Sequence, residues 1–480
     1  MAIDQITTGV SKDNAVTSAK IPAGAIEIAD VADDAITSAK IAAGAVDATA
    51  LGTGAVGTAK IAADAIDGTK LADNAVNSEH VTAGAIDTAH IGDDQVTGAK
   101  IENNPTIAGN LAVTGKTTLT GDFIPATAYN HRNVIYNGGM QIYQRGAGAP
   151  ATNNGGFALD RWRYATWGSP GVVTVTQDSD VPSGQGFSSS LKMDVTTADA
   201  SPAAGDSNGI SMKFEGQDLQ RFAKGVSGAK ASTVSFWVKS PKTGVHIVWL
   251  YDNDNNRSIS KSYTIASANT WENHSVTFAG DTTGAWGNDI NESAQLTFLT
   301  MAGANASSGT LATSWESYTA ANRGVGQVNC MDNTANNFYL TGVQWELGSN
   351  ATPFEHRSYG DELIRCQRYF CKFGNGTNGA CVNLHTGAAS GADKVYINYW
   401  LPATPRTTPT VSAAGEIRIS DNYVADHAAS PPSIVDAPGV SSTFQGGRIR
   451  LGSFSGLTTG RMYGSAATSG TGSMSWSMEL

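Results

Sequence analysis

The 480-residue sequence predicts an all-β protein whose N-terminal part is a fibre and whose later part is globular. Three observations carry this prediction. A ten-residue repeat runs through the first hundred residues without a change of phase, short alternating strands separated by Gly, Asn, Asp and Ser follow it, and helical periodicity is rare in both parts. A strict repeat is typical of solenoids and fibres, whereas short strands with frequent turns are typical of a β-sandwich.

The repeat has a turn-forming residue at its fourth position, which is Asp, Asn or Gly in every block from Asp4 to Asn104. These residues tolerate a tight turn or a left-handed backbone. Apolar positions five residues apart make no stripe on a helix, and in a straight strand they face opposite sides. We therefore expect short extended segments joined by turns.

The branched apolar residues at the first and sixth positions are the predicted core of a shaft. They are Ile21, Ile26, Val31, Ile36, Ile41, Val46, Leu51, Val56, Ile61, Ile66, Leu71, Val76, Val81, Ile86, Ile91 and Val96. Burying the apolar residues of one block contributes roughly 3–5 kcal/mol, whereas ordering its ten residues costs about 10 kcal/mol or more. Identical copies are therefore expected to bury these residues against each other. The alternative is a disordered Ala- and Gly-rich tail, against which the strict phase argues.

Composition excludes several classes of partner. Charged residues make up 15% of the chain and the formal net charge is −11, which argues against binding nucleic acid or an anionic membrane through charge. No apolar run is long enough for a membrane span, and Met1 is followed by polar and acidic residues, so we expect cytoplasmic synthesis without a signal peptide and no membrane insertion. The 4 cysteines are too few to staple a chain of this length and are expected to be reduced.

A different pattern begins after Pro105, where the phase of the repeat ends. Leu111, Val113 and Leu119 alternate, and glycines interrupt them at Gly115 and Gly121. This pattern is similar to the short triple-stranded β-helical tracts of bacteriophage tail fibres. We expect residues 106–129 to form a neck of that kind.

From about residue 130 the sequence resembles the heads of bacteriophage tail fibres, particularly those of marine bacteriophages. The resemblance spans roughly residues 130–410 and is carried by residues 137–146 (NGGMQIYQRG), 160–162 (DRW), 344–348 (QWELG), 351–355 (ATPFE) and 362–370 (ELIRCQRYF). It implies a homotrimeric fibre with a carbohydrate-binding-like jelly-roll sandwich and a distal β-domain that meets the host surface. Alternating strands are expected at 133–146, 159–164, 233–240, 246–251, 338–346, 396–401 and 475–480, and a short helix or turn at 366–370.

The expected organisation is a shaft over residues 1–105, a neck over 106–129, a jelly-roll sandwich over 130–360 and a receptor-binding β-domain over 361–480. The resemblance implies a virion tail-fibre protein that attaches to the bacterial host by recognising envelope polysaccharide or another receptor. Its N-terminus would join the tail or an adaptor protein. Two alternatives stay open, an architectural virion fibre without receptor binding and a polysaccharide depolymerase.

Motifs for metal binding and catalysis are incomplete. Asp252 opens a segment like the start of a calcium loop, but Arg257 and Tyr263 occupy the places of the required Gly and Glu, so a polar hairpin is predicted. The spacing of Cys371, Cys381 and His385 matches no zinc pattern. Neither a phosphate-binding loop nor a nucleophile elbow is present in the sequence. We expect no metal, no cofactor and no catalytic residues, and therefore a protein that is not an enzyme.

Aromatic residues are better candidates, because sugars present C–H faces that pack on indole and phenol rings. The candidate glycan-binding residues are Trp237, Trp249, Tyr251, Tyr396 and Trp400.

Their faces follow from the alternation of strands. Trp237 should lie opposite the core residues Val234, Phe236 and Val238, while Trp249 and Tyr251 should share a face with Ile247. If Trp237 and Trp249 are neighbours, they form a platform; otherwise they cover a trimer interface or a second core layer. Tyr396 and Trp400 should likewise lie opposite Ile397 and Tyr399.

Overall fold

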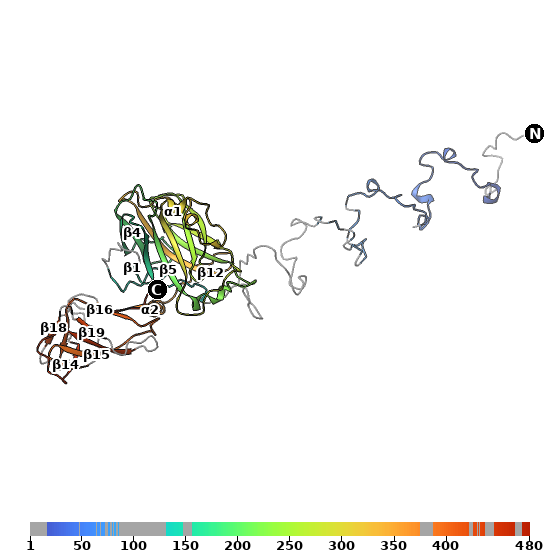
Figure 1. Cartoon of the computed structure of the whole chain (residues 1–480). Helices are drawn as coiled ribbons and strands as arrows, with labels where there is room; N and C mark the ends of the chain where they lie inside the picture. The colour runs from blue at the N-terminus through green and yellow to red at the C-terminus, as the bar shows by residue number, and fades with distance from the viewer. Residues whose placement is uncertain are drawn as a thin grey trace, which may run out of the picture. The chain divides into compact units, whose positions relative to one another are not determined.

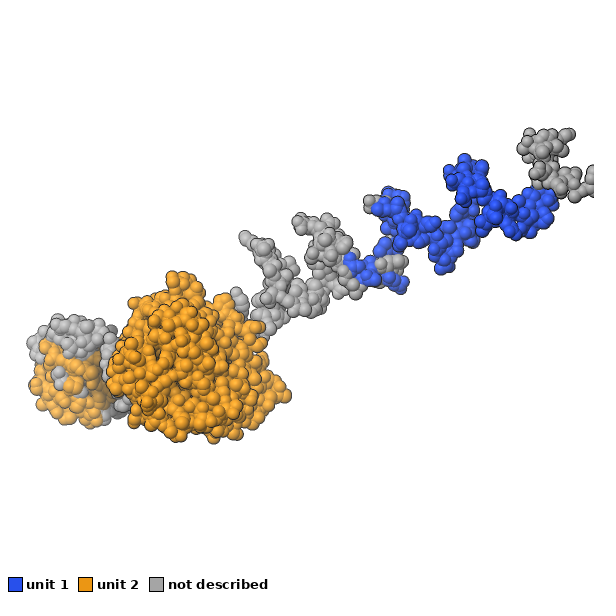
Figure 2. Space-filling view, turned by 90° about the horizontal axis from the view of Figure 1, so that it is seen from above, with its two compact units in different colours: residues 1–118 blue, residues 119–480 orange. Residues whose placement is uncertain are grey.

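The computed structural model describes residues 17–47, 49–63, 65–67, 69–72, 75–76, 79, 81–82, 85, 131–146, 156–374, 387–421, 426–429, 431, 433–436, 446–465 and 473–480. The chain divides into two compact units, residues 1–118 and 119–480 (Figure 2). The described residues contain 22 strands and two α-helices, which confirms the all-β prediction. The predicted neck lies outside the described residues, and the predicted domain boundaries stay predictions.

In the repeat, the predicted turn around the fourth position is confirmed in four consecutive blocks. The N–H of the fifth residue donates to the carbonyl three residues earlier, at 3.1 Å for Ala25 and 3.0 Å for Ala35. The fourth residue has a positive φ, between 79° and 82° at Gly24, Gly44 and Gly54 and 61° at Asp34. A positive φ at the third residue of a turn favours glycine or a short polar side chain, which explains the composition of this position.

A second turn ends each of the six described blocks between Thr17 and Lys70, where we expected an extended segment. Short 3₁₀ helices (drawn blue in Figure 1) occupy positions eight to ten; they are η1 (Ser18–Lys20), η2 (Ile28–Asp30), η3 (Ser38–Lys40) and η4 (Thr58–Lys60). In one block the Asp47 carboxylate accepts the N–H groups of Thr49 and Ala50 at 3.0 Å each. Such local bonds compete with strand pairing, and the described residues of the repeat contain no strand.

Within a single chain the predicted shaft core is exposed. The twelve apolar residues from Ile21 to Val76 are 39% to 61% exposed. Val81 is half-buried, and Ile86, Ile91 and Val96 lie outside the described residues. Local turns therefore determine the backbone of the repeat without burying its apolar side chains, and their burial between copies stays a prediction.

The predicted sandwich is confirmed in the second unit, where two antiparallel sheets enclose the main core (Figure 1). The first sheet has the order β1 (Gly156–Leu159), β2 (Trp162–Trp167), β5 (Ser207–Glu215), β10 (Glu292–Ala302), β7 (Gly244–Asp252), β8 (Arg257–Ile265) and β11 (Glu316–Ser317). The second sheet has the order β3 (Val172–Asp178), β4 (Ser190–Thr197), β12 (Asn337–Leu347), β6 (Ser232–Lys239) and β9 (Glu272–Phe278). The connections contain α1 (Ala304–Ser307), η8 (Gly216–Asp218), η9 (Gln220–Phe222) and η10 (Ala320–Asn322).

The sandwich core contains fully buried tryptophans from both sheets, among them Trp162 and Trp345. The expectation of strands within residues 133–146 is wrong, because residues 131–146 form turns and irregular backbone. The Asn137 side chain replaces a strand partner there: its Nδ2 donates to the Ile142 carbonyl and its Oδ1 accepts the Ile142 N–H, each at 2.9 Å.

The expected helix or turn at residues 366–370 is confirmed up to Tyr369, where a turn follows the helix, but the helix begins earlier in the chain than expected. Helix α2 (Tyr359–Gln367) begins after Ser358, whose side chain accepts the Asp361 N–H, and Phe370 already belongs to a strand. Two sheets follow. The smaller has the order β13 (Phe370–Phe373), β22 (Ser473–Ser477) and β16 (Thr410–Ala414). The larger has the order β18 (Asp426–Ala429), β17 (Ile417–Ser420), β21 (Met462–Ser465), β14 (Gly387–Gly391), β15 (Lys394–Trp400), β20 (Gly446–Gly452) and β19 (Ser433–Asp436).

Buried ion pairs join these C-terminal segments to the sandwich. The Glu215 carboxylate is fully buried and accepts hydrogen bonds from Arg368 at 2.7 Å and from the Tyr369 hydroxyl at 2.5 Å. Arg161 pairs with Glu479 at 2.6 Å. A buried charge is tolerated only when it is paired, so these pairs are costly to separate. They therefore hold Arg368, Tyr369 and Glu479 against the sandwich. Among the described helices, none is long and apolar enough to cross a membrane.

Candidate functional site

Trp237 lies where the alternation of β6 predicts. Val234, Phe236 and Val238 are buried in the sandwich core, whereas Trp237 faces away from it and is half-buried. A pocket of about 460 Å³ covers this part of the sheet. It is lined by Gln185, Phe187, Ser235, Trp237, Asn273, Gly342, Ala351, Thr352, Pro353, Phe354 and His356. We call it the Trp237 pocket.

One wall of the Trp237 pocket is aromatic. The Phe187 ring lies 5.1 Å from the Phe354 ring and 5.3 Å from the His356 ring, centroid to centroid. Gly342 leaves room for this wall, since a Cβ there would lie 2.6 Å from the Phe187 ring and 3.0 Å from Cδ1 of Trp237. Gly342 also has a φ of +62°, at the bulge where β12 changes register against β6. Glycine at this position therefore allows the positive φ of the bulge and leaves space for the rings of the pocket.

Polar groups complete the pocket. Asn273 is the cross-strand partner of Trp237, and its side-chain amide donates to the Phe236 carbonyl at 3.3 Å. The amide of Gln185 and the hydroxyl of Ser235 also line the pocket. A cavity with apolar rings and a few amides and hydroxyls offers stacking surface together with donors and acceptors, the combination that sugar-like ligands require. Sequence reasoning found Trp237 but missed the ring partners, although Phe354 belongs to the ATPFE segment noted above.

Trp249 and Tyr251 lie in the other sheet of the sandwich, so the platform in which Trp237 and Trp249 are neighbours is wrong. They share a face with Ile247 as predicted, but Trp249 is only 3% exposed. Tyr251 is half-buried and stacks on Trp249 with centroids 5.3 Å apart.

The segment that follows β10 covers this face. Tyr318 packs on Tyr251 at 5.2 Å, and the Arg323 guanidinium lies 4.3 Å from the Trp167 ring and 5.1 Å from the Trp249 ring. Trp249 thus belongs to a second core layer, which was the stated alternative, and is not available as a sugar platform.

Tyr396 and Trp400 share the outer face of β15, and Ile397 and Tyr399 are buried on the other face as predicted. Trp400 is 62% exposed. Its partner across the strands is Gly446, where a Cβ would lie 2.8 Å from Trp400 Cε3, so the glycine makes space for the indole.

Basic residues accompany Tyr396 on this face. The Arg448 guanidinium lies 4.2 Å from the centre of the Tyr396 ring, and Arg450 Nη1 donates to the Tyr396 hydroxyl at 3.4 Å. The outer face therefore presents two aromatic rings, two guanidinium groups and the side chain of Asn398 between the rings. We call this row the Trp400 surface.

The polar hairpin predicted around Asp252 is confirmed, because β7 ends at Asp252 and β8 begins at Arg257. The Asp252 carboxylate is fully buried and pairs with Lys224 at 2.6 Å. Burial raises the pKa of the Cys371 thiol to about 12, which favours the neutral form over the thiolate that binds metals. Cys381 and His385 lie outside the described residues.

Comparisons with known proteins find solved structures that are similar to less than half of this chain. No family model matches the chain, and no curated protein matches it. The enzymatically active domain of tailspike protein 4 of bacteriophage CBA120 is 18% identical with a TM-score of 0.25, over 45% of this chain and 21% of the tailspike chain. The chain thus spans about a fifth of that tailspike.

Carbohydrate-binding modules also match. The C-terminal family 22 module of Clostridium thermocellum Xyn10B is 11% identical with a TM-score of 0.23, over 48% of this chain and 100% of the module. A family 11 module from Clostridium thermocellum in complex with a mixed-linked tetrasaccharide is 11% identical with a TM-score of 0.22, over 42% of this chain and 95% of the module. At these TM-scores, similarity does not by itself indicate a function.

Proposed function

We propose that this chain is a bacteriophage tail-fibre protein that attaches to the bacterial surface by binding envelope polysaccharide, and that it binds the polysaccharide without cleaving it. The observation that carries the proposal is the Trp237 pocket. It combines an indole, a wall of two phenyl rings and an imidazole, and amide groups in a volume of about 460 Å³. That volume lies within the usual range for small-ligand sites, roughly 300–1,000 Å³.

The Trp400 surface is the second proposed contact. An indole that is 62% exposed leaves a large apolar area in water, which a flat sugar face would cover. An open row of this kind suits a weak contact along a polymer, whereas the Trp237 pocket suits a single residue of it.

Assembly of several chains into one fibre would raise the avidity of such weak sites for a polymer. We propose that the repeat forms a homotrimeric shaft in the virion and that its N-terminal end attaches to the phage tail or to an adaptor protein. Three heads on one shaft convert a second binding event into an intramolecular one, which raises avidity by roughly 10²–10⁴-fold without new contacts. Exposure of the apolar positions of the repeat in one chain supports this part of the proposal.

The test is binding of the full chain to an array of purified bacterial capsular and O-antigen polysaccharides. Trp237→Ala should weaken binding by roughly 1–3 kcal/mol per site, and Trp237→Phe by less, since a smaller ring remains. Trp271→Ala is the matched control, because Trp271 is also half-buried at the edge of the same sheet but outside the pocket.

Three outcomes would contradict the proposal. Unchanged binding by a folded Trp237→Ala chain would reject the pocket as the contact. No binding to any polysaccharide, or to host cells, would favour the architectural fibre. Release of new reducing ends from a bound polysaccharide would favour the depolymerase.

A further inference from the structure

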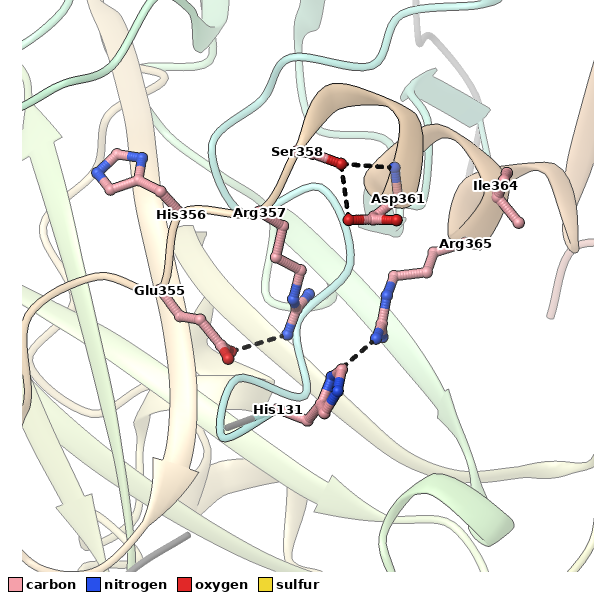
Figure 3. Close-up of a pocket in the computed structure, with 8 residues that line it drawn as sticks. All are labelled: His131, Glu355, His356, Arg357, Ser358, Asp361, Ile364 and Arg365. Atoms are coloured by element: carbon pink, nitrogen blue, oxygen red, sulfur yellow. Dashed lines mark hydrogen bonds and ion pairs between the residues drawn. The ribbon is translucent and has the colours of Figure 1, made fainter. Parts of the chain in front are cut away.

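A second hollow shares His356 with the Trp237 pocket. It has a volume of about 580 Å³ and is lined by His131, Glu355, His356, Arg357, Ser358, Asp361, Ile364 and Arg365 (Figure 3). An adjoining hollow of about 410 Å³ shares His131 and Arg365 with it and adds Tyr136, Asp218 and Arg221. We call the two together the His131 pocket.

Two guanidinium groups converge on one residue in this pocket. Arg365, from α2, points across the hollow and its Nη2 donates to Nδ1 of His131 at 3.3 Å (Figure 3). Arg221, from the end of η9, donates to the backbone carbonyl of His131. Within the described part of the chain, neither guanidinium has a carboxylate within ion-pair distance. Two guanidinium charges held close together repel each other unless an anion joins them.

Each carboxylate of the pocket accepts hydrogen bonds from groups other than Arg221 and Arg365. Glu355 pairs with Arg357 at 3.1 Å and accepts the Asn133 N–H at 2.9 Å. Asp361 accepts the Ser358 hydroxyl at 2.6 Å. Asp218 similarly accepts the Tyr136 hydroxyl at 2.6 Å. Arg257 shows the contrast, because it forms an ion pair with Asp281 at 2.8 Å. Arg221 and Arg365 have no such carboxylate partner among the described residues.

His131 adds a donor to the two guanidiniums. Because its Nδ1 accepts a hydrogen bond from Arg365, the ring proton of the neutral imidazole lies on Nε2, where it can donate. Guanidinium groups match the geometry of an oxyanion better than any other side chain, since their N–H groups form a fixed fork.

We propose that the His131 pocket binds the carboxylate of an acidic sugar, with Arg221, Arg365 and His131 as its donors. The presence of an anion site does not depend on the function proposed above; only its source, an acidic residue of the surface polysaccharide, rests on that function. His356 lines both this pocket and the Trp237 pocket, so adjacent residues of one polymer can occupy the two.

The experiment is calorimetric titration of the full chain at low ionic strength with glucuronate, with glucose as the uncharged analogue and with inorganic phosphate. Glucuronate should bind at least about tenfold more tightly than glucose, and Arg365→Gln and Arg221→Gln should each weaken it by about tenfold or more, as expected for loss of a charge-assisted hydrogen bond. Lys230→Gln is the control, because Lys230 is exposed and lies outside the pocket.

Equal affinities for glucuronate and glucose would overturn the proposal, as would an equal loss in Lys230→Gln. Phosphate binding that depends on Arg365 without glucuronate binding would overturn the acidic-sugar assignment. A melting curve of each variant checks that it folds. Failure of this experiment leaves the result of Trp237→Ala on polysaccharide arrays standing, so the two proposals fail separately.

Discussion

The repeat and the globular part of the chain from residue 131 onward, here called the head, contain the same kinds of apolar residue. These residues are exposed in the repeat and buried in the head. In the repeat, Ile36 is 61% exposed although two hydrogen-bonded turns per block define its backbone. In the head, Ile210 and Val238 are fully buried between sheets whose strands come from distant parts of the sequence. Local hydrogen bonds thus suffice to shape a backbone, whereas burial requires a second layer. The head contains its own second layer, whereas burial of the repeat's apolar residues between copies of the chain is the prediction tested below.

The strongest test of this comparison is to truncate a large apolar side chain to alanine in each region. Trp345→Ala removes a buried ring that packs on Phe214, Phe222 and Trp286, and should lower the free energy of unfolding of the head by about 3–5 kcal/mol. Ile26→Ala in the repeat should leave the head transition unchanged. Denaturant unfolding of the full chain measures the stability of the head in both variants. A similar decrease in its free energy of unfolding in the two would contradict the comparison.

The buried ion pairs of the head give the next largest effect. Glu215→Ala leaves Arg368 and the Tyr369 hydroxyl without their buried acceptor and should cost about 3–5 kcal/mol. Asp393→Ala removes the exposed partner of Lys394 and should leave the unfolding midpoint nearly unchanged. Equal midpoints for the two variants would show that the Glu215 contacts do not join the C-terminal segments to the sandwich.

A buried histidine makes the head sensitive to acid. Burial lowers the pKa of His246 to about 4, while the unfolded chain has the ordinary value of 6.5. Between these values the unfolded state binds more protons, so stability is lost as the pH falls from about 6.5 towards 4, by up to roughly 1.4 kcal/mol per pH unit.

Unfolding of the full chain at several pH values tests this dependence, with His246→Gln as the comparison. The Gln side chain can still donate to the Lys242 carbonyl, which the His246 Nε2 contacts at 3.0 Å. The variant should show a flatter dependence between pH 4.5 and 6.5. A slope as steep as that of the unaltered chain would exclude His246 as its source.

A substitution in the repeat is expected to have the smallest effect on the stability of the head. Ile61→Asp places a charge at a position predicted to be buried between copies, so amide protection should fall in the neighbouring blocks of the assembled fibre while the head melts as before. Hydrogen exchange resolves the two regions in one sample. Unchanged protection around Ile61 would indicate that this position faces solvent in the fibre.

Sequence patterns with a period of two were sufficient for much of this picture. They predicted that Trp237 lies opposite Phe236 and that Trp400 lies opposite Tyr399, because alternation along one strand is a local property. The residue types at the fourth position of the ten-residue repeat predicted the turn at Asp34, because only a few residue types accept a positive φ.

Features that depend on distant segments could not be predicted in this way. The wall of the Trp237 pocket joins Phe187 to Phe354 and His356, and the cover over Trp249 comes from Tyr318. Neither pairing leaves a trace in local periodicity. The second turn of the repeat was missed for another reason. It is closed by local backbone hydrogen bonds, such as that from the Lys20 N–H to the Thr17 carbonyl at 2.8 Å, which alternation does not describe.

The central claim, that the repeat is completed only by other copies of the chain, is tested most directly by the molar mass of the full-length protein over a dilution series, with hydrogen exchange followed in the same samples. The account predicts three times the 49.7 kDa of one chain, with amides of the repeat protected in the assembly and exchanging freely once it dissociates, while those of the head stay protected throughout. A 49.7 kDa monomer whose repeat amides are as protected as those of the head would contradict it.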